Sequence, residues 1–239
     1  MNPYPPVVFA EPDEPFWGFS ELFATAAFFV VALLVVAAAF RPFVGSDVPV
    51  GYWAVLEESI AYFVAFTGLK FLFARQGQPL LASLGWVDSP FPVQWLIATG
   101  ITLSLLTVVL SVVLRTPDIE TPFEKILSDP LSRVTIAIFG VLCAPLIEEL
   151  LFRGLLQPRL VATFGVLPGI LITSSFFGAL HLVQNAMLWQ SFVLITIVGF
   201  VLGVIRHVSG STKASTIVHI AYNTLPLIGL IAQSPQKPS

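Results

Sequence analysis

The stretch from Leu160 to Ile205 reads LVATFGVLPGILITSSFFGALHLVQNAMLWQSFVLITIVGFVLGVI and contains no formal charge apart from the titratable His181. One helical crossing of a lipid bilayer needs roughly 20 apolar residues. The stretch is therefore long enough for two crossings, and the polar pair Gln184 and Asn185 marks the turn between them. It predicts two neighbouring membrane helices.

The rest of the chain shares this apolar character. Of its 239 residues, 56% are hydrophobic and only 10% are charged, with a mean hydropathy of +0.89, whereas soluble domains carry roughly 25% charged residues. A net charge of -3 without a long basic run excludes the usual footprint of a nucleic-acid-binding protein. The single cysteine, Cys143, excludes an internal disulfide and a thiolate metal cage. We expect an all-helical integral membrane protein.

Further apolar runs set the expected number of membrane spans. Residues 22–40, 89–114 and 214–236 each predict one crossing. Residues 52–73 and 134–157 are also long enough, but both runs contain charged side chains. Together these runs predict a polytopic transmembrane helical bundle of about seven spans, with six or eight as alternatives.

The chain divides by composition into four parts. Residues 1–16 form a Pro-rich acidic N-terminus that we expect to be disordered, and it lacks the basic region of a signal peptide. Residues 17–130 hold N-terminal membrane helices and an interfacial helix, residues 131–233 the functional core, and residues 234–239 a polar tail.

The interfacial helix is predicted by a short local motif. Thr121-Pro122-Phe123-Glu124 has the pattern of a capping box with proline at the first helical position. We expect this helix to end before Pro130.

The most unusual segment of the core is Ala144-Pro145-Leu146-Ile147-Glu148-Glu149-Leu150-Leu151-Phe152-Arg153-Gly154. Charges at membrane depth are costly unless they are paired or solvated, so they mark a functional site. Glu149 and Arg153 have the spacing of a helical ion pair, and Glu148 is turned about 100° away from Glu149. Pro145 removes a helical N–H, so the carbonyl one turn earlier needs another partner.

Two of the three histidines lie on apolar helices with a companion one turn away. His181 follows Phe177 by four residues, and His219 precedes Asn223 by four. His207, beside Arg206, is expected in a solvated loop. A carboxylate with an imidazole can deprotonate water, while a second imidazole with an amide can stabilise the oxyanion that forms when water attacks a carbonyl. These groups suffice for amide hydrolysis.

Helix geometry places these groups at similar depths. If the fourth helix ends near Pro158 and the last begins near Ala214, Glu148 and Asn223 both lie roughly ten residues, about 15 Å, from one membrane face. His181 comes out closer to the opposite face, where we expect the site to open.

The motifs resemble those of the CAAX proteases and bacteriocin-processing enzymes, the CPBP or Abi family of intramembrane proteases. The Glu-Glu-x-x-x-Arg, Phe-x-x-x-His and His-x-x-x-Asn motifs of the family match, in order, Glu148, Glu149 and Arg153; Phe177 and His181; and His219 and Asn223. The resemblance covers about Leu131 to Ile231.

This resemblance implies an intramembrane endopeptidase, CAAX prenyl protease-like, that cleaves membrane-associated peptides or proteins. By carry-over, Glu148 activates water with His181, and His219 and Asn223 stabilise the oxyanion. Glu149 and Arg153 complete the catalytic set, and Phe177 supports His181. The partners implied are a peptide or protein substrate and the lipid bilayer, with no nucleic acid.

The cofactor prediction rests on spacing. Members of this family are often described as metalloproteases, but the chain has no His-Glu-x-x-His, and His181 and His219 lie far apart in sequence. We therefore favour a glutamate-type enzyme with no cofactor, and zinc is the alternative.

Other functions and the compartment stay open at this point. A non-enzymatic membrane scaffold or a proton-coupled transporter would also use buried Glu and His side chains. With the acidic N-terminus outside, slightly more Lys and Arg residues fall inside than outside. We accordingly expect a bacterial-type inner (cell) membrane protein whose site opens to the cytoplasm.

Two other patterns receive non-catalytic interpretations. Glu57 and Glu58 repeat the acidic pair, but Tyr62 stands where an arginine would follow, so we predict a solvated or interfacial position. Gly199 and Gly203, like Ser174 and Gly178, have the spacing of close helix packing.

Overall fold

A computed structural model describes residues 14–43, 48–127 and 129–232, and within these ranges the chain is helical and contains no strand. The predicted all-helical class is confirmed. Residues 1–13 of the predicted disordered N-terminus and the predicted tail 234–239 lie outside the described residues. The main elements are α1 (Phe19–Phe40), η1 (Arg41–Phe43), α2 (Val50–Arg75), α3 (Leu80–Ser83), α4 (Val93–Val113), α5 (Pro122–Ile126), α6 (Pro130–Ile138), η2 (Phe139–Cys143), α7 (Ala144–Glu149), η3 (Leu150–Leu156), α8 (Gln157–Phe164), α9 (Val166–Leu180), α10 (Trp189–Ser209) and α11 (Thr212–Ala232).

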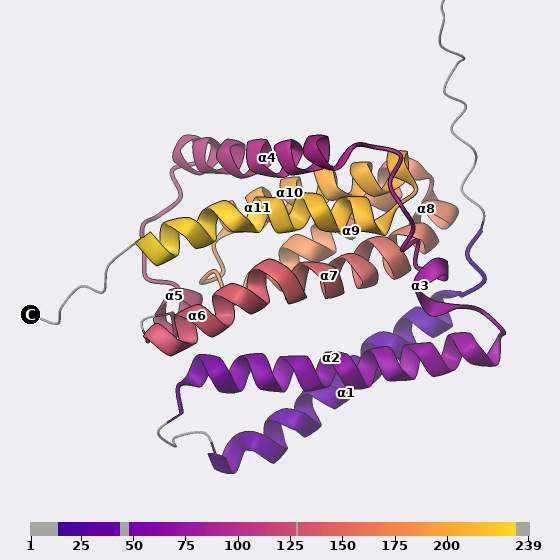
Figure 1. Ribbon diagram of the computed structural model, residues 1–239, viewed down its shortest axis with the longest axis horizontal. Helices are drawn as coiled ribbons and strands as arrows, with labels where there is room; N and C mark the ends of the chain where they lie inside the picture. The colour runs from indigo at the N-terminus through magenta and orange to yellow at the C-terminus, as the bar shows by residue number, and fades with distance from the viewer. Residues whose placement is uncertain (1–13, 44–47, 128, 233–239) are drawn as a thin grey trace, which may run out of the picture.

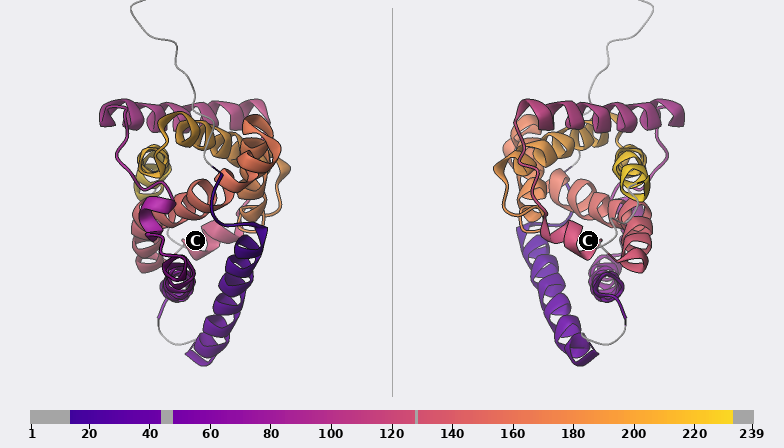
Figure 2. Two further views of the ribbon diagram at one scale, coloured as in Figure 1. Left: turned by 90° about the vertical axis from the view of Figure 1, so that its right-hand side faces the viewer. Right: turned by 90° about the vertical axis from the view of Figure 1, so that its left-hand side faces the viewer.

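The helices form a bundle in which α7 and α11 run through the middle (Figure 1). Helix α11 packs against α4 and α7, α10 packs against α9, and α2 packs against α6 and α1. The end-on views show α1 and α2 on the opposite side of the bundle from α4 (Figure 2). The elements that carry the acidic motif and the two histidines therefore meet in the interior.

Residues 130–164 form one long helix with two stretches of the wider π-helix. In η2 the Ala144 N–H donates to the Phe139 carbonyl, and in η3 the Gln157 N–H donates to the Phe152 carbonyl. Each bond spans five residues, and a proline follows directly in both cases. Proline has no N–H, and in an α-helix its ring strikes the carbonyl four residues back. A widened turn at each proline lets the helix continue.

The predicted end of this helix near Pro158 is therefore wrong, because the helix runs through that proline to Phe164. Similarly, His207 lies in the last turn of α10 and not in a loop. The predicted capping box is confirmed: Glu124 N–H donates to the Thr121 hydroxyl oxygen, 3.2 Å away, and Thr121 N–H donates to the Glu124 carboxylate at 2.8 Å.

Four described helices are long and apolar enough to cross a membrane: Phe19–Phe40, Val93–Val113, Pro130–Phe164 and Trp189–Ser209. This number is lower than the predicted seven. Helix α9 is apolar but has only 15 residues. Helices α2 and α11 are long enough, but they carry polar groups such as Glu58 and His219 within their length. An integral membrane protein is the conclusion that these spans support.

The start of α11, and with it His219, is held by the segment that follows α3. Thr212 N–H donates to the Gly85 carbonyl at 2.8 Å, and the Thr212 hydroxyl donates to the Leu84 carbonyl at 2.6 Å. Gly85 has a φ of +72°, a conformation that favours glycine. Nearby, a hydrogen bond from Lys213 lowers the pKa of the exposed Asp88 carboxyl. These contacts set the position of α11 along the bundle.

Candidate active site

A fully buried ion pair lies at the centre of the site. Arg153 Nη1 is 2.9 Å from Glu149 Oε1, and both side chains have 0% exposure. Arg153 Nη2 donates to the Gly199 carbonyl at 2.9 Å, and the guanidinium carbon lies 4.6 Å from the centre of the Phe177 ring. The predicted pairing of Glu149 with Arg153 is present. The arginine also joins the acidic helix to α9 and α10.

The predicted close packing of the glycines makes room for this arginine. A Cβ atom on Gly199 would lie 3.3 Å from Arg153 Nη2 and 3.2 Å from Ser174 Cα. One turn further along both helices, Gln157 Nε2 donates to the Gly203 carbonyl at 2.9 Å. This role of Gln157 was not predicted from the sequence. Its spacing of four residues from Arg153, which matches the spacing of Gly203 from Gly199, could have indicated it.

The second packing pair is confirmed as well. A Cβ atom on Gly178 would collide with the Thr196 hydroxyl and lie 2.9 Å from the Phe192 carbonyl. The Ser174 side chain is completely buried and donates to the Ile170 carbonyl. Helices α9 and α10 therefore approach each other closely at Gly178 and Ser174.

His219 contacts both acidic side chains. Its Nδ1 atom is 3.1 Å from Glu149 Oε1, and its Nε2 atom is 3.7 Å from Glu148 Oε2. Because Glu149 is paired with Arg153, its carboxylate accepts the hydrogen bond and the His219 Nδ1–H donates it. The Nε2 atom of His219 therefore faces Glu148.

His181 faces Glu148 from another helix. It caps the C-terminus of α9, and its Nδ1 atom is 2.7 Å from the Phe177 carbonyl oxygen. A carbonyl only accepts, so Nδ1 carries the proton and the Nε2 atom of a neutral ring keeps its lone pair. That Nε2 atom lies 4.0 Å from Glu148 Oε1. The Phe177 ring is close to both imidazoles, with centre-to-centre distances of 4.6 Å to His181 and 5.8 Å to His219.

Glu148 is thus the group on which the two histidines converge. Its side chain is 19% exposed, and both imidazole separations exceed the length of a direct hydrogen bond. Glu148, His181, His219 and Asn223 all line one cavity with a volume of about 1390 Å³. The expected meeting of these four residues in one cavity is found.

Asn223 has a structural partner that the sequence reasoning did not identify. Its Nδ2 atom donates to the Gly140 carbonyl at 2.8 Å. In the π-helical pattern of η2, this carbonyl would accept from residue 145, which is proline. The amide of Asn223 therefore replaces the missing N–H. Since an amide has two N–H donors, one remains for another acceptor.

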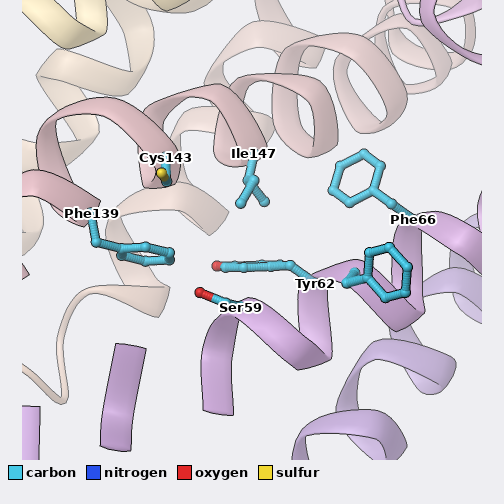
Figure 3. A pocket seen from close by; sticks show the side chains of 7 residues that line it. Ser59, Tyr62, Phe66, Phe139, Cys143 and Ile147 are labelled. Atoms are coloured by element: carbon cyan, nitrogen blue, oxygen red, sulfur yellow. The ribbon is translucent and has the colours of Figure 1, made fainter. Parts of the chain in front are cut away.

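Glu58 lies where it was not expected. It lines the same cavity as Glu148, and the Tyr62 hydroxyl donates to Glu58 Oε1 at 2.9 Å. The predicted solvated or interfacial position is wrong, because α2 packs along α6 and turns this residue toward the interior. Figure 3 shows the Tyr62 ring between α2 and the helix carrying Cys143 and Ile147. The four-residue spacing of Glu58 and Tyr62 was the available signal.

Zinc is the alternative cofactor in the sequence prediction. In residues 14–43, 48–127 and 129–232, no group of three or more His, Cys, Asp or Glu side chains is arranged to hold a metal ion. We therefore assign no catalytic step to a metal, and the metal requirement stays a prediction to be tested.

Comparison with known proteins identifies the region that carries the site. Residues 130–225 match the family model described as type II CAAX prenyl endopeptidase Rce1-like. This match confirms the resemblance inferred from the three motifs. All residues of these motifs lie inside the matched region, and Glu58 lies outside it. No curated protein and no solved structure matches the chain.

Proposed function

Since residues 130–225 are Rce1-like, a protease family, we propose that the protein is an intramembrane endopeptidase that hydrolyses peptide bonds with water activated by Glu148 and His181. One observation carries this proposal. The Nε2 atoms of His181 and His219, from two different helices, lie within 4.0 Å of the same carboxylate in a large cavity.

The first step is the activation of a water molecule between Glu148 and His181. Glu148 takes a proton from a water molecule whose oxygen attacks the scissile carbonyl carbon. The Nε2 lone pair of His181 accepts a hydrogen bond from the same water and orients it. When the carbon–nitrogen bond breaks, the proton held by Glu148 passes to the leaving amine.

The second part of the proposal concerns the oxyanion. His219 Nε2 and the free N–H of Asn223 donate to the oxygen that becomes negative in the tetrahedral intermediate. Because His219 Nδ1–H is already bonded to Glu149, donation from Nε2 requires a ring that carries both protons. Glu149 supplies the counter-charge for that ring, and Arg153 holds Glu149 in place.

The proposal includes the placement in the membrane. Helices α2, α9 and α11 join the four apolar spans inside a bacterial-type inner membrane, because their polar residues Glu58, His181 and His219 line the cavity and need not face lipid. The cavity opens to the cytoplasm. Thiol labelling from either side of the membrane, with single cysteines at the helix ends, tests both statements.

The function is tested by comparing the native protein with Glu148→Gln. We expect membranes that contain the native protein to yield peptide fragments that are absent with Glu148→Gln, while Glu57→Gln, outside the cavity lining, cleaves like the native protein. A proton-coupled transporter or a scaffold would produce identical fragment patterns for all three proteins.

A further inference from the structure

The large cavity extends well beyond the catalytic residues, and its charges are unbalanced. Its charged lining comprises Arg133, the His219 ring in its doubly protonated form, and the carboxylates of Glu58, Asp118, Glu120, Glu124 and Glu148. Of these carboxylates, Glu120 lies 3.9 Å from Lys125, which is outside the lining. Arg133 donates from Nε to the Leu127 carbonyl at 3.1 Å. Several carboxylates are thus gathered around a space into which, under the proposed function, a peptide enters.

Glu58 is the carboxylate in this lining that most needs an explanation. Its side chain is partly buried, it accepts one hydrogen bond from Tyr62, and it lines the same cavity as the Glu148 carboxylate. Across the part of the chain that the structure describes, Glu58 forms no ion pair with Lys, Arg or His. A carboxylate removed from water without a counter-charge is costly.

Tyr62 holds this carboxylate in place. The tyrosine ring lines an open pocket of about 290 Å³ together with mostly apolar groups, among them Phe66, Phe139 and Ile147. Figure 3 shows its hydroxyl oxygen on the side of the ring away from Phe66. The ring stacks on Phe29, with the ring centres 5.1 Å apart. Its hydroxyl donates to Glu58 Oε1, which leaves Oε2 for another donor.

We infer that Glu58 recognises a positively charged side chain, Lys or Arg, of the substrate peptide near the bond that is cut. The inference rests on the proposed endopeptidase function. A bound cation would balance the carboxylate that no described residue neutralises. The cavity volume of about 1390 Å³ exceeds the roughly 300–1,000 Å³ of a typical small-molecule site, so it has room for an extended segment with a long side chain.

The test uses pairs of peptides that differ only in charge. One lysine is moved through the positions that flank the cleaved bond, and at each position it is compared with acetyl-lysine, which keeps the stem but lacks the charge. Binding is measured with Glu148→Gln protein in lipid nanodiscs, so that no peptide is cut, and cleavage is measured with the native protein.

We expect lysine to bind at least about tenfold more tightly than acetyl-lysine at one position. The added substitution Glu58→Gln removes this preference, whereas Glu57→Gln, on the same helix but outside the cavity lining, keeps it. Tyr62→Phe retains the carboxylate and therefore also retains a preference. If Glu58→Gln does not fold, Glu58→Asp, which keeps the charge on a shorter stem, should weaken the preference.

Two outcomes would overturn the inference. One is equal binding of lysine and acetyl-lysine at every position, and the other is an unchanged preference in Glu58→Gln. The proposed function fails separately: a lysine preference in binding that depends on Glu58, without cleavage by the native protein, would support recognition and reject the endopeptidase.

Discussion

The side-chain amide of Asn223 donates to the carbonyl of Gly140, 2.8 Å away, and so makes the hydrogen bond that Pro145 cannot make. This contact ties α11 to the acidic helix across 83 residues of sequence. A single residue thereby combines a structural task with its proposed place in the oxyanion site. The two tasks can be separated experimentally.

Replacing Asn223 should have a cost that depends on residue 145. Asn223→Ala leaves the Gly140 carbonyl unpaired, which we expect to cost about 1–3 kcal/mol of stability. In a Pro145→Ala background, the new N–H can bond to Gly140, so the same substitution should cost much less. Thermal unfolding of the four proteins in detergent measures the coupling. An equal loss of stability in both backgrounds would show that Asn223 does not substitute for the proline.

The two adjacent glutamates should respond differently to the same substitution. Glu148→Gln should abolish cleavage and leave the unfolding temperature unchanged, because an amide cannot take the proton from water. Glu149→Gln should lower both activity and stability, since it leaves Arg153 as a buried unpaired charge. Peptide cleavage and thermal unfolding are measured on both. Full activity in Glu148→Gln, with a folded but inactive Glu149→Gln, would reverse the roles.

Removing Arg153 should be among the most destabilising single changes in the core. Arg153→Ala strands the Glu149 carboxylate in the interior, with an expected cost of about 3–5 kcal/mol. Arg153→Lys should also be poor, because one ammonium cannot reproduce the two directed bonds to Glu149 and Gly199. The double variant Glu149→Gln, Arg153→Met serves as the control, because it removes both charges and leaves no unpaired buried charge. A double variant less stable than Arg153→Ala would contradict this account.

Metal content distinguishes the two mechanistic types. We expect purified, active protein to contain no stoichiometric zinc, and we expect chelators to leave cleavage unchanged. Elemental analysis beside a chelator titration is the measurement. About one zinc per chain, with activity lost on chelation and restored by zinc, would replace the mechanism and keep the endopeptidase.

A pair of helical glycines tests the packing around α11. In Gly100→Ala, the new Cβ would collide with the Val218 carbonyl and lie 2.6 Å from Ala221 Cβ, so α4 would have to move and stability should fall by roughly 1–3 kcal/mol. Gly140→Ala meets nothing within 4 Å and should be neutral or stabilise by up to about 1 kcal/mol. Unfolding temperatures compare the two, and similar values would contradict the observed packing.

Local interactions with a fixed spacing were readable from the residues alone. Glu149 pairs with Arg153, and Thr121 caps its helix with Glu124, because the helical period determines which neighbours meet. The uninterrupted apolar runs, each of roughly 20 residues, indicated the all-helical class, because a helix of that length crosses the bilayer and satisfies its backbone hydrogen bonds within the segment. The three motifs also indicated the resemblance to CAAX proteases, and the Rce1-like family model matches the segment that carries them, residues 130–225.

Only the tertiary structure decided which faces of the helices pack against one another and which side chains this packing brings into the cavity. Glu58 enters the cavity because α2 packs on α6, and no pattern within α2 specifies that partner. The helix passes Pro158 because a π turn fits there, and Asn223 reaches Gly140 from a distant segment. Contacts such as the one between Asn223 and Gly140 join residues far apart in sequence. Helical periodicity predicts only which residues within one helix lie on the same face, so it does not predict these contacts. Their physical origin is the burial of whole helix faces against one another.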